Sequence, residues 1–149
     1  MEATIATGEY GGSPENRALL LLQVLDAVLS VWSSDRIGIS ISPATQFYGM
    51  SDSGPQFIFN CLAAALNRYS LATHHRTPYS GNAEVKEGLQ PVAAASLREL
   101  FTSRIIAAGG FVATGAEAIL EKGDADLVAF GRLFIANPDL PHRFRRAFR

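Results

Sequence analysis

Apolar residues recur along the chain in segments that alternate between helical spacing and short β-branched runs. Ser13-Pro14 has the form of a helix N-cap followed by proline at the first helical position, and apolar residues then recur at helical spacing as far as Trp32. The run from Arg36 to Pro43 is rich in isoleucine and stops at proline, which predicts a strand. Helix and strand therefore alternate from the start of the chain.

The same alternation continues to the last residues. After a Gly/Ser/Pro-rich loop that reaches Pro55, the spacing predicts a helix over 56–69, a strand over 71–75 and a polar loop over 76–90. Beyond it we expect a helix at 92–101, a strand at 104–108, a helix capped by Thr114 that ends at Gly123, a strand at 127–130 and a short helix after Pro138. Such alternation predicts an α/β fold of about four parallel strands with flanking helices.

Composition and charge exclude several classes of protein. The chain has 149 residues, of which 48% are hydrophobic, enough for one domain over residues 1–149 with a core of its own. Its net charge of −1 argues against nucleic-acid or anionic-membrane partners. The single cysteine, Cys61, excludes an internal disulfide. The first residues lack a signal peptide and the Leu19–Leu22 run is too short to span a bilayer, so we expect a cytoplasmic protein.

The sequence contains none of the common short motifs of hydrolases, nucleotide-binding loops or zinc sites. His74 and His75 are adjacent on a predicted strand, so they cannot chelate one metal ion together, and no metal is expected. A single histidine on a strand is more often a hydrogen-bonded structural residue than an acid or base. Single residues and short motifs therefore predict no function for this chain.

Several motifs taken together resemble the Old Yellow Enzyme family of flavin-dependent ene-reductases. These are EYGGSPENR at 9–17, the strand that ends in Ser42-Pro43, FYGMS at 47–51, Ala108-Gly109-Gly110 and the run from Asp126 to Leu140. They follow the order of strands five to eight in that family, over residues 9 to about 146. The resemblance implies the C-terminal half of a (β/α)8 TIM barrel.

The resemblance also implies a phosphate site. It places Gly109, Gly110, Gly131 and Arg132 where relatives hold the 5′-phosphate of FMN. Glycine permits close backbone approach, and arginine makes paired hydrogen bonds to phosphate oxygens. The alternative interpretation is that the glycines only turn the chain and that Arg132 pairs with an acidic neighbour.

The flavin ring site departs from the family pattern. Relatives have an arginine on the fifth strand, where this chain has Ser40, and a neutral hydroxyl cannot stabilise an anionic reduced ring as a guanidinium does. The strands that in relatives supply the substrate-binding and proton-donating residues have no counterpart here. We therefore expect a repurposed isomerase or cyclase that needs no cofactor and acts on a small unsaturated or carbonyl-bearing metabolite. Ser40, Tyr48 and His75 are its candidate catalytic residues, with Arg132 as an anion clamp.

Two other functions stay open. The chain can instead be a split or truncated ene-reductase that uses FMN and NAD(P)H, or a non-catalytic partner that regulates an intact relative. In every case a sheet cut from a barrel has unpaired edges and a bare apolar face. We expect a homodimer that completes the barrel in preference to a separate N-terminal half, because a closed two-fold assembly needs only one gene product.

Overall fold

The computed structural model describes residues 7–42, 54–71, 75–78 and 94–147, with the backbone alone for 75–78 and 147. The longer helices are α1 (Pro14–Leu29), α2 (Pro55–Leu66), α4 (Ala113–Glu121) and α6 (Leu140–Ala147). The shorter helices are α3 (Ala94–Arg98) and α5 (Arg132–Ala136), and single 3₁₀ turns cover Ser34–Arg36 and Asn67–Tyr69. The strands are β1 (Ile39–Ser40), β2 (His75–Pro78), β3 (Ile105–Ala108) and β4 (Leu127–Ala129).

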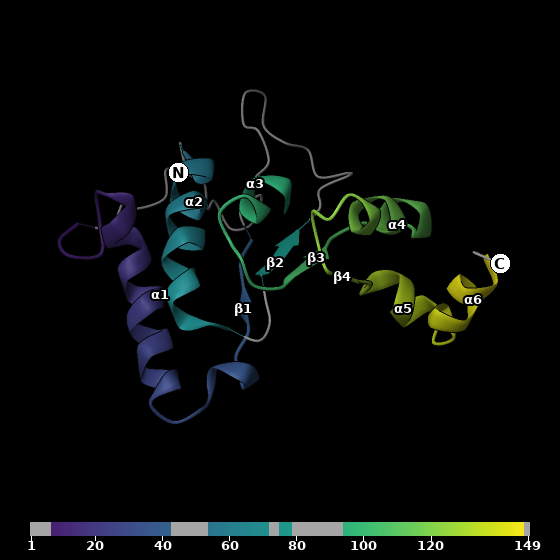
Figure 1. The fold of residues 1–149 in the computed structure, drawn as a ribbon, viewed down its shortest axis with the longest axis horizontal. Helices are drawn as coiled ribbons and strands as arrows, with labels where there is room; N and C mark the ends of the chain where they lie inside the picture. Colours follow the sequence, from purple (N-terminus) through teal and green to yellow (C-terminus); the bar gives the residue numbers. More distant parts are fainter. Residues whose placement is uncertain (1–6, 43–53, 72–74, 79–93, 148–149) are drawn as a thin grey trace.

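The strands form one parallel sheet in the order β1-β2-β3-β4, so each strand lies next to its successor in the sequence. Helices connect the strands, as βαβ units require. Figure 1 shows α1 and α2 side by side at one end of the molecule and α6 at the other, with the sheet between them. The α/β fold with parallel strands is therefore confirmed in the described residues.

The start of α1 agrees with the sequence pattern. The Ser13 hydroxyl accepts a hydrogen bond from the Asn16 backbone N–H at 3.3 Å, and Pro14 takes the first helical position. This bond satisfies one of the N–H groups that the first turn of a helix leaves without a partner. The helix predicted after Pro138 is also present, as α6.

Several predicted element boundaries are wrong, and the second strand and the fourth helix are the clearest cases. The second strand was predicted to end at His75, but the described strand runs over His75–Pro78, because pairing with β3 overrides the polar sequence after His75. Leu71, where the strand was predicted to begin, is not in a strand and is buried in the core after a left-handed turn at Ser70. Helix α4 begins at Ala113, one residue before Thr114, and its N-cap is Val112, which makes no side-chain cap. Helix α5 was not predicted.

The core lies between the sheet and helices α1 to α4. Its largest fully buried side chains are Phe101, Leu66, Leu97 and Ile105. The Asn67 side chain joins the end of α2 to the loop before β3, because its amide donates to the Leu100 carbonyl at 2.6 Å and its oxygen accepts from the Thr102 N–H at 3.0 Å. These two bonds tie the end of α2 to the chain segment that leads into β3.

Asp126 anchors β3 and β4 at their amino ends. Its carboxylate accepts a hydrogen bond from the Ile105 N–H at 2.7 Å and pairs with the Arg98 guanidinium, while its own N–H donates to the Ile105 carbonyl at 2.9 Å. Asp124, at the other end of this short segment, pairs with Lys122 at 2.7 Å. Among the described residues, no helix has the length and apolar character needed to cross a membrane.

Candidate functional site

The carboxyl ends of β3 and β4 lie side by side. Ala108, the last residue of β3, is the register partner of Ala129, the last residue of β4. Because both strands run in the same direction, the segments that follow them leave the sheet at the same edge, which is where α/β proteins build their sites. Gly109-Gly110 follow the first strand, and Phe130-Gly131-Arg132 follow the second.

A cavity of about 450 Å³ opens between these two segments, and we call it the Gly-Arg cavity. All four residues of the predicted phosphate site line it, namely Gly109, Gly110, Gly131 and Arg132. Phe111, Val112, Ala129, Phe130 and Leu133 complete its wall. The structure thus gathers in one place residues that are more than 20 positions apart in the sequence, as Gly110 and Gly131 are.

The glycines of this cavity have different physical roles. Gly109 and Gly110 have φ angles of 114° and 71°, a region that side chains disfavour, so glycine is needed there for the turn itself. Gly131 has φ of −81°, which any residue adopts, and a Cβ added there would meet no atom within 4 Å. Neither conformation nor packing explains glycine at this position. Without a side chain, the Gly131 backbone is exposed at the cavity wall.

Arg132 is the one cationic residue among the described residues that line the cavity. Arg132 is exposed at the first position of α5, and α4 begins next to Val112 in the same wall. The first turn of a helix presents N–H groups that have no partner within the helix, and these favour anions. The described ion pairs join Arg98 to Asp126, Lys122 to Asp124 and Arg143 to Asp139, and none of them includes Arg132. A phosphate therefore fits the donors present.

The predicted catalytic residues are not assembled around this cavity. Ser40 is exposed at the end of β1, where its register partner is Arg76, and it is not part of the cavity wall. His75 lies in β2 beside Ile39 and Ile105, but its side chain falls outside the described part of the chain, as does all of Tyr48. Among the described lining residues, Arg132 is the one ionisable group. No acid–base pair is present there.

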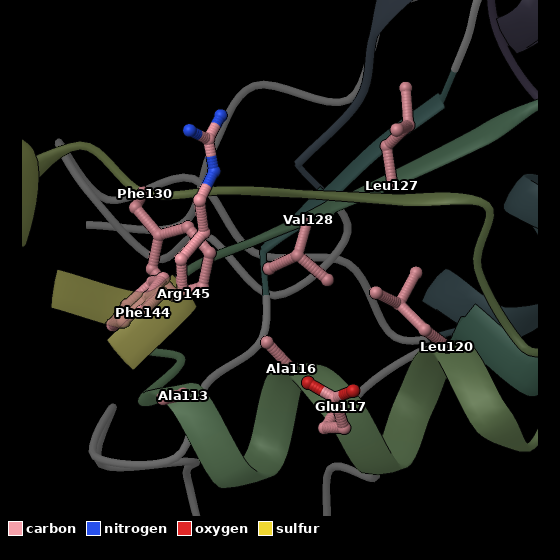
Figure 2. A pocket seen from close by; sticks show the side chains of 9 residues that line it. All are labelled: Ala113, Ala116, Glu117, Leu120, Leu127, Val128, Phe130, Phe144 and Arg145. Carbon is pink, nitrogen blue, oxygen red and sulfur yellow. The ribbon is translucent and has the colours of Figure 1, made fainter. Parts of the chain in front are cut away.

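A second cavity, of about 390 Å³, lies between α4, β4 and α6 (Figure 2). Its wall is almost entirely apolar and includes Leu120, Leu127, Val128 and Phe144. Glu117 and Arg145 are its charged members; they come from different helices and lie apart in Figure 2. Polar groups do not converge on this cavity, so we interpret it as a gap in helix packing and not as a catalytic or binding site.

Sequence analysis missed Phe130, which lines both cavities. Phe130 directly precedes Gly131-Arg132 in the sequence, but an aromatic residue after a strand does not indicate that its ring separates two cavities. In the described residues no cluster of three or more histidine, cysteine, aspartate or glutamate side chains is arranged to hold a metal ion.

Comparisons with known proteins agree on one family. Residues 5–148 match the NADH:flavin oxidoreductase / NADH oxidase family. The chain is 39% identical over 144 residues to 12-oxophytodienoate reductase 1 of Oryza sativa subsp. japonica, covering 93% of this chain and 37% of that protein.

Solved structures give the same result. Morphinone reductase in complex with tetrahydroNAD superimposes with a TM-score of 0.82 at 39% identity, covering 95% of this chain and 37% of that one. The old yellow enzyme of Trypanosoma cruzi gives 0.85 at 29% identity, with coverage of 96% and 37%. The chain thus spans somewhat over a third of the length of these relatives. It belongs to the NADH:flavin oxidoreductase / NADH oxidase family.

Proposed function

We propose that this chain supplies the phosphate-binding end of an FMN-dependent, NAD(P)H-using reductase and corresponds to the C-terminal half of its barrel. The observation that carries the proposal is the Gly-Arg cavity, where the glycines at the ends of two neighbouring strands and Arg132 line one space. FMN, when bound, would supply the hydride chemistry. The chain itself would bind and orient the phosphate through backbone N–H groups and the Arg132 guanidinium.

This proposal ranks above the flavin-independent isomerase or cyclase that the sequence first suggested. That hypothesis needs an acid or base at the site, and the described wall of the Gly-Arg cavity offers Arg132 alone. Ser40 still favours it, because a neutral, exposed hydroxyl replaces the cation expected near the flavin ring. We keep it as the second candidate. A regulatory partner without turnover is the third.

Calorimetric titration with FMN and with riboflavin, which lacks the phosphate, separates these functions. We expect FMN to bind at least about tenfold more tightly, because a charge-assisted hydrogen bond contributes about 1.5–3 kcal/mol. Arg132→Ala should remove most of that difference. Arg145→Ala is the matched control, since Arg145 is an exposed arginine that follows the same strand but does not line the Gly-Arg cavity.

Equal affinity for FMN and riboflavin, or an Arg132→Ala variant that keeps the full difference, would contradict the phosphate assignment. Isomerisation of an enone by protein free of flavin would favour the second candidate. Binding of FMN without reduction of any enone, even in the completed barrel, would favour the regulatory partner.

A further inference from the structure

Arg132 lies on an exposed segment of the chain. Residues 131–136, which include the whole of α5, are all exposed. None of the described ion pairs includes Arg132, and α5 has no side-chain N-cap. The packing of α5 therefore does not fix the position of the guanidinium, and the groups that hold it have to lie before or after this segment.

Phe130 lies before the exposed segment and helix α6 lies after it. Phe130 is half-buried and packs against the hydrophobic core. In α6, Leu140 is buried and Phe144 is half-buried, whereas residues 141–143 and 145–146 are exposed. Because Leu140 and Phe144 are four positions apart, they lie on one face of the helix. This face holds α6 to the rest of the protein.

Phe144 connects the two sides of the exposed segment. Its ring meets that of Phe130 edge to face, with the centroids 4.9 Å apart, and Figure 2 shows the two side chains next to each other. The ring pair therefore closes a loop, residues 131–143, that carries Arg132. Closing a loop at a fixed pair of residues restricts the positions that the residues within it can reach.

The Phe130 ring has empty space on both sides. It lines the Gly-Arg cavity and also the second cavity, of about 390 Å³. A side chain that borders empty space has fewer atoms in contact to restrain it, so the contact with Phe144 contributes a larger share of what holds the ring. A displaced ring would shift Gly131 and Arg132 as well, because these residues follow Phe130 directly.

We propose, on the basis of the function proposed above, that Phe144 is a positioning residue for the binding of a phosphate monoester in the Gly-Arg cavity. Phe144 does not line that cavity, so it acts through Phe130. Its ring holds Phe130, and Phe130 in turn holds the Gly131 backbone and the Arg132 guanidinium in position for the phosphate oxygens. Binding and the order of α6 are then coupled, so a bound phosphate also protects α6.

Calorimetric titration with FMN and with riboflavin measures this role as the ratio of the two affinities. Partial unfolding of a variant weakens the binding of both ligands equally, so the ratio reports on the phosphate site and not on stability. In Phe144→Ala we expect the preference for FMN to fall by about threefold or more, the factor that corresponds to the energy of one aromatic pair. Phe144→Tyr keeps the ring and should keep the preference.

Leu120→Ala is the matched control. Leu120 lines the second cavity, as Phe144 does, but it does not line the Gly-Arg cavity. The substitution therefore enlarges the second cavity without removing the ring pair, and it should leave the preference for FMN unchanged. A second measurement needs no flavin. In the ligand-free chain, Phe144→Ala should shift the backbone amide NMR signals of Gly131 and Arg132, whereas Leu120→Ala should not.

A preference for FMN that is present in the wild-type chain and unchanged in Phe144→Ala would overturn the positioning role. So would an equal loss of preference in Leu120→Ala, or signals of Gly131 and Arg132 that stay in place in Phe144→Ala. A wild-type chain without any preference for FMN would instead contradict the proposed function, and the positioning role with it.

Discussion

The rings of Phe130 and Phe144 meet edge to face, with centroids 4.9 Å apart and planes at 66°. Phe130 follows β4 and forms part of the Gly-Arg cavity, while Phe144 lies in α6. The pair therefore joins the terminal helix to the wall of the proposed phosphate site. This geometry is the favoured one for aromatic rings, because the edge of one ring faces the electron-rich face of the other.

Replacing Phe144 by alanine tests this connection. We expect Phe144→Ala to lower the free energy of unfolding by about 1–3 kcal/mol, because the substitution removes both the ring contact with Phe130 and the buried apolar surface of the Phe144 ring. Helix α6 should exchange its amide hydrogens faster, and hydrogen exchange followed by mass spectrometry measures this. Unchanged protection of residues 140–147 would show that the ring pair does not hold α6.

Phe101 is the largest side chain in the fully buried set. Phe101→Ala should lower the free energy of unfolding by about 3–5 kcal/mol, because it removes buried surface and leaves a cavity that the sheet and α3 cannot close. Urea denaturation measures the change. Phe57→Ala, at a 66% exposed position, is the control and should cost far less. Similar losses for the two variants would mean that the core is not where the structure places it.

The Asp139–Arg143 pair makes α6 sensitive to acid. The hydrogen bond from the Arg143 Nε to the Asp139 carboxylate, at 2.9 Å, lowers the pKa of Asp139. Because the pKa in the folded state is below that in the unfolded state, this stabilisation is present above the unfolded pKa and is lost as the pH falls through the folded value. An NMR titration should show the pKa of Asp139 rising in Arg143→Ala. An unchanged value would exclude the pair as the cause.

Cys61 is expected to be a slow nucleophile. Partial burial raises the pKa of its thiol, and the nearby Glu15 carboxylate, 3.9 Å from the Sγ atom, raises it further. Since the thiolate is the reactive form, alkylation near neutral pH should be slower than for a free thiol. Glu15→Gln should shift the pH profile of the iodoacetamide reaction to lower pH. An unchanged pH profile in Glu15→Gln would mean that burial alone raises the pKa of the Cys61 thiol.

Much of the fold could be predicted from the sequence because its signals are local. Ser13-Pro14 marks the start of α1, and the isoleucine-rich run before Gly109-Gly110 marks β3. Strand β2 could not be placed, because Arg76, Thr77 and Pro78 look like a loop and become a strand only through pairing with β3. Long-range pairing of this kind has no local signature.

The candidate site was predictable only in part, for the same reason. The glycines and Arg132 were visible as motifs, and the register of β3 with β4 brings them together. Phe130 and the anchoring role of Asp126 depend on contacts with distant residues and were not recognised. Ser40, proposed as catalytic, does not line the cavity, and the roles of Tyr48 and His75 remain predictions that concern side chains outside the described residues.

The binding of phosphate in the Gly-Arg cavity is the central claim, and the backbone amide signals of Gly109, Gly110 and Gly131 report on it directly. In a two-dimensional NMR titration with inorganic phosphate and then FMN, we expect these signals to shift together. Arg132→Lys should weaken the response, because lysine keeps the charge but loses the paired hydrogen bonds. Glycine signals that stay in place at saturating FMN, or that shift equally with riboflavin, would contradict the account.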